Sequence, residues 1–399
     1  MKRNDRVAIV SEGLPFGGTT TLSLFLASGL RQLGASAMVF NFTDEHPLKA
    51  DFERLEIPVH VEARADRIYE DRLAGVLRAL GQFRPTSVFA FLSASSFETL
   101  RYVPQGVLRV GTIHDHHEQI YRLVHNYLPW IDQITVGCRA ELERARNEYP
   151  ATACRLLTYG IPIEPDRPMR ASRPDKPIRI LFFGRLQHSQ KQVRIFPEIW
   201  RELKKRNVEF QWTIHGEGPE EGFLRDALKT GVETGEIRFS APVPHNRLQQ
   251  IIAEHDIYLL TSAHEGGPLT LLEAMAQGLV PVCADIPGIV QDALQPSNGV
   301  RVPFDDPAAY ADAIAELAMD RRRTDAMSAN AVQMLESGYS EIALAQRYLD
   351  FLADVQPELT SPEWPERIAA RPIVSASPLK FHPLVRPLRR LAKRLKPRA

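Results

Sequence analysis

The feature that most constrains the fold of this chain is a regular alternation of short apolar runs with stretches of helical period. The apolar runs are rich in β-branched and aromatic residues, which favour strands, and they recur along most of the 399 residues. Parallel strands that are buried on both faces are joined by crossover helices and produce this alternation. The fold class is therefore predicted to be α/β. The expected strands are Arg6–Ser11, Met38–Phe42, Val59–Glu62, Ser87–Ser93, Leu108–His114, Ile134–Gly137, Arg155–Thr158, Ile178–Phe183, Phe210–His215, Ile237–Ser240, Ile257–Thr261 and Val280–Cys283.

A proline-rich segment divides the alternation into two halves. Prolines recur between Gly160 and Pro177 with charged residues between them, and proline cannot continue a helix. We therefore predict one domain over residues 1–168 and a second over residues 169–338, with a ligand cleft between them. The first helix is expected from Thr19, as its cap, to Leu33. An amphipathic helix is expected within residues 339–356, followed by a separate tail over residues 357–399.

Composition places the chain among globular proteins of a reducing compartment. Hydrophobic residues make up 44% of the chain and charged residues 25%. No apolar run approaches the roughly 20 residues that cross a bilayer, and the start does not resemble a signal peptide. The cysteines at 138, 154 and 283 are odd in number and lack the spacing of metal ligands. A cytoplasmic protein is expected.

The zero net charge conceals a strongly basic C-terminal tail. Residues 378–399 hold eight basic residues and no acid, so the remainder carries 49 − 8 = 41 basic against 49 acidic residues. Leucines at 384, 388, 391 and 395 follow helical spacing among these basic residues. Such a helix suits an anionic membrane surface, which predicts a peripheral position on the inner face of the plasma membrane. A solubilising tail or a helix docked on a protein are the alternatives, and nucleic acid is disfavoured because interleaved aromatics are absent.

The most informative segment follows the predicted strand that ends near Thr261. It reads Ser-Ala-His-Glu-Gly-Gly-Pro-Leu-Thr-Leu-Leu-Glu-Ala-Met-Ala-Gln-Gly from Ser262 to Gly278. The two glycines, Gly266 and Gly267, let the backbone approach a ligand, and Pro268 suits the first helical position. The helix start then offers free N–H groups and a positive dipole end, which favour a phosphate.

Two carboxylates flank this predicted anion site. Glu265 lies where strands of an open sheet end, and Glu273 lies about one and a half turns into the helix. Carboxylates repel phosphates but accept hydrogen bonds well from sugar hydroxyls. A nucleotide sugar needs this combination of hydroxyl acceptors at both ends and cationic donors between them.

Cations follow the first strand of the second half. Phe-Phe-Gly-Arg-Leu spans residues 182–186, and Lys191 comes six residues after Arg185. One forked and one point-like cation just beyond a strand are suited to neutralise a diphosphate.

These segments together resemble the retaining family with the two-domain GT-B fold that is called glycosyltransferase family 4. The resemblance covers roughly residues 6–353 and rests on Glu265-x7-Glu273 with Gly184-Arg185-Leu186 and Lys191. It implies two Rossmann-like domains facing a central cleft, with a C-terminal crossover helix that packs back on the first domain. Lys191 is followed by Gln192 where that family usually has glycine. The residues that the resemblance implies for donor binding are Gly17, Gly18, Gly184, Arg185, Lys191, Glu265, Gly266, Gly267, Pro268, Leu269 and Glu273.

The resemblance also implies the chemistry. Glu265 would contact the transferred sugar and Glu273 the ribose, while Arg185 and Lys191 hold the diphosphate. With His114 at a strand end, near the sugar, the implied catalytic set is His114, Arg185, Lys191 and Glu265. The implied activity is a retaining, metal-independent transfer of a hexose from a UDP- or GDP-linked sugar to a glycan, a lipid-linked or another acceptor. Cell-envelope polysaccharide or glycolipid synthesis is the expected setting, and no cofactor is expected.

Other interpretations of the same residues remain. A non-catalytic nucleotide-sugar-binding partner and a nucleotide-sugar epimerase have the same architecture, and Gly17-Gly18 alone is also typical of a simple strand-to-helix turn. The glycines from Gly216 to Gly222 resemble a dinucleotide fingerprint, but the next strand does not end in an acid, so a tight turn is expected. His114-Asp-His-His-Glu118 suggests metal ligands, yet adjacent residues cannot all face one ion, and no metal site is predicted.

Overall fold

The computed structural model describes residues 5–14, 17–43, 48–62, 68–91, 93–173, 175–241, 243, 245–355 and 364. These residues form two compact units, one of residues 1–160 with 341–399 and one of residues 161–340. We call them unit 1 and unit 2. The basic segment of residues 378–399, and with it the expected membrane contact, lies outside the described residues. Within the described part of the chain, none of the helices combines the length and apolarity needed to span a bilayer.

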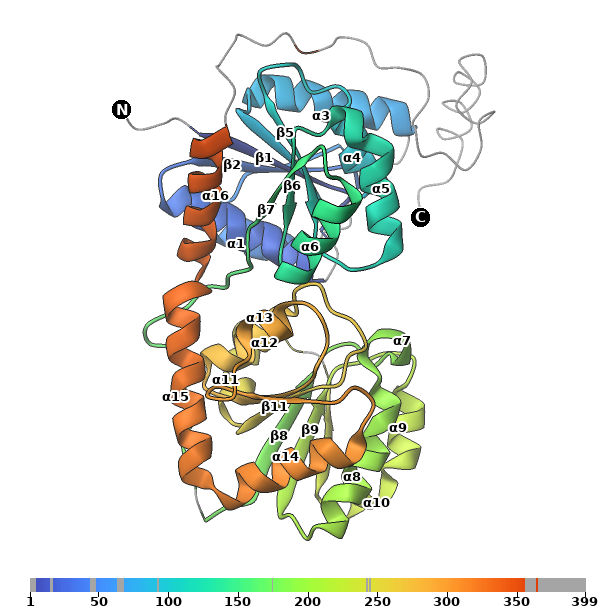
Figure 1. Ribbon diagram of the computed structural model, residues 1–399, viewed down its shortest axis with the longest axis vertical. Helices are drawn as coiled ribbons and strands as arrows, with labels where there is room; N and C mark the ends of the chain where they lie inside the picture. Colours follow the sequence, from blue (N-terminus) through green and yellow to red (C-terminus); the bar gives the residue numbers. More distant parts are fainter. Residues whose placement is uncertain are drawn as a thin grey trace. The chain divides into compact units, whose positions relative to one another are not determined.

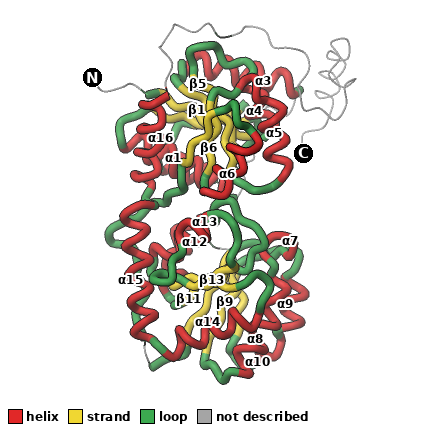
Figure 2. Tube along the Cα trace, in the orientation of Figure 1, coloured by secondary structure: helices red, strands yellow, loops and turns green. Residues whose placement is uncertain are grey.

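Unit 1 is built on a seven-stranded parallel sheet (Figures 1 and 2). The strand order is β3-β2-β1-β4-β5-β6-β7, and every pair is parallel. The central strands are continuous apolar runs because helices cover both of their faces. The strands are β1 (Arg6–Ser11), β2 (Ser36–Asn41), β3 (Val59–Val61), β4 (Ser87–Phe91), β5 (Leu108–Ile113), β6 (Gln133–Val136) and β7 (Ala153–Leu156).

The helices of unit 1 connect these strands, and one of them comes from the far end of the sequence. They are α1 (Gly18–Gln32), α2 (Lys49–Arg54), α3 (Tyr69–Phe83), α4 (Ala94–Leu100), α5 (Glu118–Tyr127), the 3-10 turn η1 (Leu128–Trp130), α6 (Arg139–Glu148) and α16 (Glu341–Val355). Helix α16 packs along α1, and its Tyr348 ring lies 5.3 Å from the ring of Phe89. Arg347 donates to the carbonyl oxygens of Thr158 and Tyr159 at 3.1 and 3.0 Å. These contacts make the C-terminal helix part of unit 1.

Unit 2 has a six-stranded parallel sheet with the order β10-β9-β8-β11-β12-β13. Its strands are β8 (Ile178–Phe183), β9 (Phe210–His215), β10 (Ile237–Ser240), β11 (Ile257–Leu260), β12 (Val280–Ala284) and β13 (Val300–Val302). Its helices are α7 (His188–Lys191), η2 (Val193–Ile195), α8 (Phe196–Lys205), α9 (Glu221–Ala227), α10 (Lys229–Glu233), α11 (His245–Ala253), α12 (Leu269–Ala276), α13 (Ile289–Ala293), α14 (Pro307–Met319) and α15 (Arg321–Gly338).

The expected α/β class is confirmed, with local differences from the sequence prediction. The bounds of β1, β8, β9 and β10 agree with the predicted ranges, and the other predicted strands differ at their ends. Thr19 does not cap α1, because the helix begins at Gly18 with Gly17 in the capping position. Strand β13 was not predicted, because it has three residues with Arg301 at its centre.

Both sheets reverse their strand order at one place, and that place indicates where ligands bind. In unit 2 the order runs outward from β8 in one direction and from β11 in the other, so β8 and β11 are neighbours at the reversal. Unit 1 has the same reversal between β1 and β4. In open α/β sheets, ligands bind beyond the carboxyl ends of the strands at such a point.

The contact between α1 and α16 gives a test of the fold. A Cβ atom at Gly29 would lie 2.6 Å from the carbonyl oxygen of Glu341 and 2.9 Å from Cβ of Ala345. We expect Gly29→Ala to lower the free energy of unfolding of unit 1 by about 1–3 kcal/mol, because the methyl group overpacks this contact. Gly222→Ala, where a Cβ meets no atom within 4 Å, is the control. Chemical denaturation that gives Gly29→Ala the stability of the unmodified protein would contradict the packing.

Candidate functional site

The first cation of the candidate site lies in a loop whose backbone is fixed. After β8, the Gly184 N–H donates to the carbonyl oxygen of His215 at 3.0 Å, and the Leu186 N–H donates to that of Glu217 at 2.8 Å. Arg185 lies between these two bonds and is exposed. Its side chain has no hydrogen bond or ion pair with the residues that the structure describes. The guanidinium is therefore available to a ligand, while its backbone position is set.

Two glycines allow the loop after β9 to pack directly against the loop after β8. A Cβ atom at Gly216 would lie 1.9 Å from the carbonyl oxygen of Gly184, and one at Gly218 would lie 2.4 Å from that of Leu186. Both glycines have positive φ, 147° and 156°, which other residues rarely adopt. These glycines thus form the expected tight turn, and the turn supports the loop that carries Arg185.

The second cation ends a single helical turn, α7. The helix closes at Gln192, which has φ 52° and ψ 33° in the left-handed region. This conformation favours glycine, the residue that the resembling family usually has there. The chain therefore keeps a backbone typical of glycine with a different side chain. The turn directs Lys191 back across the loop, and its Cε would lie 3.7 Å from a Cβ at Gly184.

The Lys191 ammonium contacts the first predicted glutamate. Lys191 Nζ lies 2.5 Å from Oε1 of Glu265, and their side chains are only 14% and 7% exposed. The Ser262 hydroxyl donates to the same oxygen at 2.6 Å, and the Gln190 amide lies 3.4 Å from Oε2. A buried ion pair of this kind persists because hydrogen bonds compensate its desolvation. A ligand with both an anionic group and a hydroxyl offers new partners to both residues: the anion can pair with Lys191, and the hydroxyl can donate to Glu265.

Two further hydrogen bonds join the segments that follow β8 and β11. The Thr261 hydroxyl donates to the carbonyl oxygen of Lys191 at 2.7 Å, and the Ala263 N–H donates to that of Gln190 at 2.8 Å. These bonds connect the cation-bearing turn to the acidic loop directly at the reversal of strand order. The segment after β8, which bears the cations, and the segment after β11, which bears Glu265, therefore form one candidate site in unit 2.

A helix of eight residues, α12, begins at the end of this acidic loop. Pro268 occupies the capping position and Leu269 begins the helix, so the prediction of Pro268 as the first helical residue is wrong by one position. Proline with an extended ψ of 90° precedes the helix rather than starting its turn. Gly266 is buried and Gly267 is partly exposed beside it. The helix start still offers its positive dipole end at the site.

The second predicted glutamate, Glu273, shares a neighbour with the first, Glu265: the charges of both act on Tyr258. Tyr258 of β11 is buried, and its hydroxyl lies 2.8 Å from the Thr270 hydroxyl. Burial raises the pKa of Tyr258 well above its usual value, and the charges of Glu265 and Glu273 raise it further. The two carboxylates thus act electrostatically on the same hydroxyl.

The remaining predicted residues lie in unit 1. Gly17 caps α1 after β1, and Gly18 is the first residue of that helix. His114 follows β5 and is buried, with its ring 4.8 Å from the Phe91 ring. Neither ring nitrogen of His114 has a hydrogen-bond partner among the residues that the structure describes, and burial lowers the pKa of His114 to about 4. The imidazole is therefore neutral at physiological pH and able to donate or accept one hydrogen bond.

The structure brings together the predicted residues of unit 2 and adds several that the sequence did not single out. Thr261, Ser262, Gln190 and Tyr258 position the predicted ligands and contribute no charge of their own. One signal was available for two of them. Thr261 and Ser262 are polar residues at the end of an apolar strand, where a site was expected.

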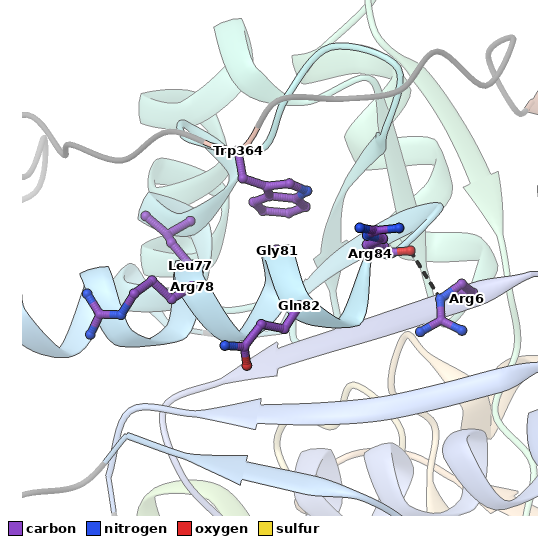
Figure 3. A pocket seen from close by; sticks show the side chains of 7 residues that line it. All are labelled: Arg6, Leu77, Arg78, Gly81, Gln82, Arg84 and Trp364. Atoms are coloured by element: carbon purple, nitrogen blue, oxygen red, sulfur yellow. Dashed lines mark hydrogen bonds between the residues drawn. The ribbon is translucent and has the colours of Figure 1, made fainter.

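A separate hollow of about 870 Å³ lies on unit 1 (Figure 3). It includes Arg6, the first residue of β1, and Arg84, which directly follows α3. The hollow is therefore at the amino ends of the strands, opposite to the edge where doubly wound sheets bind ligands. Its other lining residues are Leu77, Arg78, Gly81, Gln82 and Trp364.

Comparison with known proteins shows which family part of this chain is similar to. Residues 177–320 match the family described as Glycosyl transferases group 1. The GDP-mannose:cellobiosyl-diphosphopolyprenol alpha-mannosyltransferase of Xanthomonas oryzae pv. oryzae is 27% identical over 184 residues, which are 44% of this chain and 47% of that protein. The putative colanic acid biosynthesis glycosyltransferase WcaL of Escherichia coli is 26% identical over 256 residues, 61% of this chain and 57% of that protein. The matches thus span about half the length of these relatives.

Solved structures match both units. Anabaena Alr3699/HepE in complex with UDP and glucose aligns with a TM-score of 0.70 at 16% identity, over 88% of this chain and all of that chain. TarM aligns with a TM-score of 0.72 at 12% identity, over 88% and 99%. At these identities the likeness shows the fold, which is GT-B.

The buried histidine gives a pH-dependent test. Because burial lowers the folded-state pKa of His114 from 6.5 to about 4, the unfolded chain binds more protons between these values. Stability must therefore fall as pH falls, by about 2 kcal/mol from this residue between pH 6.5 and pH 5. We expect His114→Gln, which does not titrate, to lose about that much less over the same interval in urea denaturation. Parallel pH profiles for the two proteins would contradict the burial of a neutral imidazole.

Proposed function

We propose that this chain, a GT-B protein whose residues 177–320 belong to the glycosyl transferases group 1 family, is a glycosyltransferase that uses a nucleotide diphosphate sugar. The observation that carries the proposal is the joined site of unit 2. At the reversal of strand order, Lys191 pairs with Glu265, Arg185 follows β8 with no hydrogen bond or ion pair to a described residue, and Glu273 lies in the helix after the acidic loop. Cations suit the diphosphate, and carboxylates suit the hydroxyls on either side of it.

Binding of the donor would exchange the partners of one ion pair. In the free protein Lys191 and Glu265 neutralise each other. A diphosphate gives Lys191 a stronger anionic partner, and a hydroxyl of the sugar gives Glu265 a donor in return. Glu265 then holds the transferred sugar, and Glu273 accepts from the ribose. The exchange keeps both groups hydrogen-bonded, because the diphosphate pairs with Lys191 while Glu265 keeps the Ser262 hydroxyl and gains the sugar hydroxyl as donors.

The same cations would promote departure of the leaving group. Cleavage of the bond to the anomeric carbon leaves negative charge on the nucleotide diphosphate. Arg185, Lys191 and the start of α12 stabilise that charge from preset positions, which is the most effective form of electrostatic catalysis. We infer that these two cations and the start of α12 take the place of a divalent metal. We also infer retention at the anomeric carbon, with a donor phosphate oxygen accepting the proton of the acceptor hydroxyl.

The names of similar proteins support particular donors and a particular class of product. One relative is named for GDP-mannose, and one structural neighbour holds UDP and glucose. We therefore propose a UDP- or GDP-linked hexose as donor, and a glycan, lipid-linked or other acceptor in cell-envelope polysaccharide or glycolipid synthesis. The cytosol, or the inner face of the plasma membrane reached through the basic tail, is the proposed location.

The donor can be identified by thermal stabilisation. We expect one of the UDP-, GDP- or ADP-linked sugars to raise the melting temperature of the full chain, with 1 mM EDTA present throughout. A ligand at 100 times its dissociation constant adds about 2.7 kcal/mol. Glu273→Ala should lose most of this shift, because the ribose loses its acceptor. Equal shifts for the variant and the unmodified protein, or a shift that requires a divalent metal, would contradict the proposed site.

Measurement of turnover tests the role of Arg185, the exposed cation, in transfer. We expect Arg185→Ala to lower the transfer rate at least about tenfold, because a charged hydrogen bond to the leaving group contributes about 1.5–3 kcal/mol. The fold should be unaffected, since the Arg185 side chain contacts no described partner. Arg201→Ala, an exposed arginine in α8, is the matched control and should retain full activity. A folded Arg185→Ala enzyme with undiminished turnover would refute the role.

Incubation of the enzyme with the donor alone separates transfer from isomerisation. A glycosyltransferase without acceptor is expected to hydrolyse the donor slowly and release the free sugar. Release of an epimerised nucleotide sugar would instead identify an epimerase.

A further inference from the structure

A second cluster of chemically active side chains lies in unit 1. His116, Cys138 and Glu141 each direct one ligand-type atom to a common point, and these atoms lie within 4.8 Å of one another. The Cys138 sulfur is 3.6 Å from Nε2 of His116. Cys138 and Glu141 are buried, and His116 is partly exposed. A nitrogen, a sulfur and an oxygen therefore converge at a place that solvent reaches from one side.

The topology of the sheet brings these distant residues together. His116 lies in the loop between β5 and α5, whereas Cys138 lies two residues beyond the end of β6, in the N-cap position of α6. Strands β5 and β6 are parallel neighbours, so their carboxyl ends meet at one edge. Glu141 lies in the first turn of α6, and its Oε2 accepts the N–H of Gly137 at 2.8 Å.

The cluster is held in place by contacts that leave its ligand atoms directed inward. Arg144 donates to the backbone oxygen of His116 at 3.0 Å, which anchors the histidine loop on α6. The carboxylates of Glu118 and Glu148 already pair with that guanidinium, each at 2.6 Å. Arg144 therefore fixes the loop and does not serve as the cationic partner of Glu141.

One atom of the cluster lacks the partner that its burial demands. Glu141 is fully buried; the Gly137 N–H and the Cys138 thiol hydrogen-bond to its carboxyl group, and its Oε1 lacks a partner of good hydrogen-bond geometry among the described residues. Asp115 adds a second acidic side chain that interacts electrostatically with Glu141. An unsatisfied carboxylate oxygen in a buried acidic setting is costly, and a cation at that point would satisfy it.

The ligand types and spacing indicate which cation fits. A zinc ion binds cysteine sulfur at about 2.3 Å and histidine nitrogen at about 2.0–2.1 Å, so two such ligands in a tetrahedron lie about 3.5 Å apart. The observed separation of 3.6 Å between sulfur and nitrogen is close to that value. Magnesium and calcium prefer oxygen ligands and are disfavoured by a thiolate and an imidazole.

We propose that His116 Nε2, Cys138 Sγ and the Glu141 carboxylate bind one zinc-type transition-metal ion in unit 1. Three protein ligands leave a fourth tetrahedral position for water or a substrate atom, as in catalytic rather than structural zinc sites. The thiol loses its proton to solvent when the metal binds, so affinity rises with pH. The three ligands all lie in unit 1, whereas Arg185, Lys191, Glu265 and Glu273 lie in unit 2.

Cobalt substitution tests this assignment directly. The full chain is freed of metal with a chelator and titrated with Co²⁺, which reports a thiolate ligand by near-ultraviolet charge-transfer absorption and tetrahedral geometry by intense visible bands. We expect one equivalent to bind with both signals and to be displaced by Zn²⁺. Cys138→Ala should abolish the thiolate band, while Cys154→Ala, another buried cysteine of unit 1, should retain it.

Two further variants keep the test decisive if Cys138→Ala fails to fold. His116→Ala should weaken Zn²⁺ binding at least about tenfold by calorimetry, a typical loss when a metal site is perturbed. Glu141→Gln keeps an oxygen for the Gly137 N–H and should weaken binding by a similar factor. Absence of a thiolate band in the unmodified protein, or unchanged Zn²⁺ affinity in folded variants, would overturn the metal site and leave only a thiol–imidazole hydrogen bond.

Discussion

The contact between Lys191 and Glu265 is the interaction on which the candidate site depends. It joins the segment after β8 to the segment after β11, the two strands between which the sheet of unit 2 reverses its order. Without a partner, either charge would be costly at its burial, so each holds the other in position. Thr261 and Ser262 secure the pair from the strand end. The free protein thus already holds Lys191 and Glu265 together. A ligand need only replace Glu265 as the partner of Lys191, and Lys191 as the partner of Glu265.

The backbone around the pair is as constrained as the side chains. Gly216 and Gly218 let one loop rest directly on the carbonyl oxygens of another, and Gln192 adopts a conformation that usually requires glycine. This rigidity separates two tasks. The backbone fixes where Arg185 starts, and the exposed guanidinium remains free to reach a charged group. The guanidinium therefore becomes an ordered donor only when a charged ligand binds it.

The sequence predicted the framework well because apolar runs and helical periods are local signals. Ile178–Phe183 is a continuous buried run, and its bounds were predicted correctly, whereas Val300–Val302 is too short and too polar at its centre to be recognised. The sequence also singled out the charged residues of the candidate site, since they follow strand ends in a recognisable pattern, and the structure places Lys191 against Glu265. Their supporting partner Tyr258 lies within an apolar strand and carries no such pattern. The approach of His116 to Cys138 arises because β5 and β6 are neighbouring strands, which spacing in the sequence does not reveal.

The central claim is that unit 2 recognises a diphosphate through its two cations, and calorimetry of nucleotide pairs tests it most directly. UDP and UMP, and likewise GDP and GMP, differ only in the terminal phosphate that Arg185 and Lys191 are expected to hold. The account predicts that the diphosphate of one pair binds at least about tenfold more tightly than its monophosphate, and that Arg185→Ala removes most of this preference. Equal affinities within each pair, or a preference that survives in Arg185→Ala, would contradict the account.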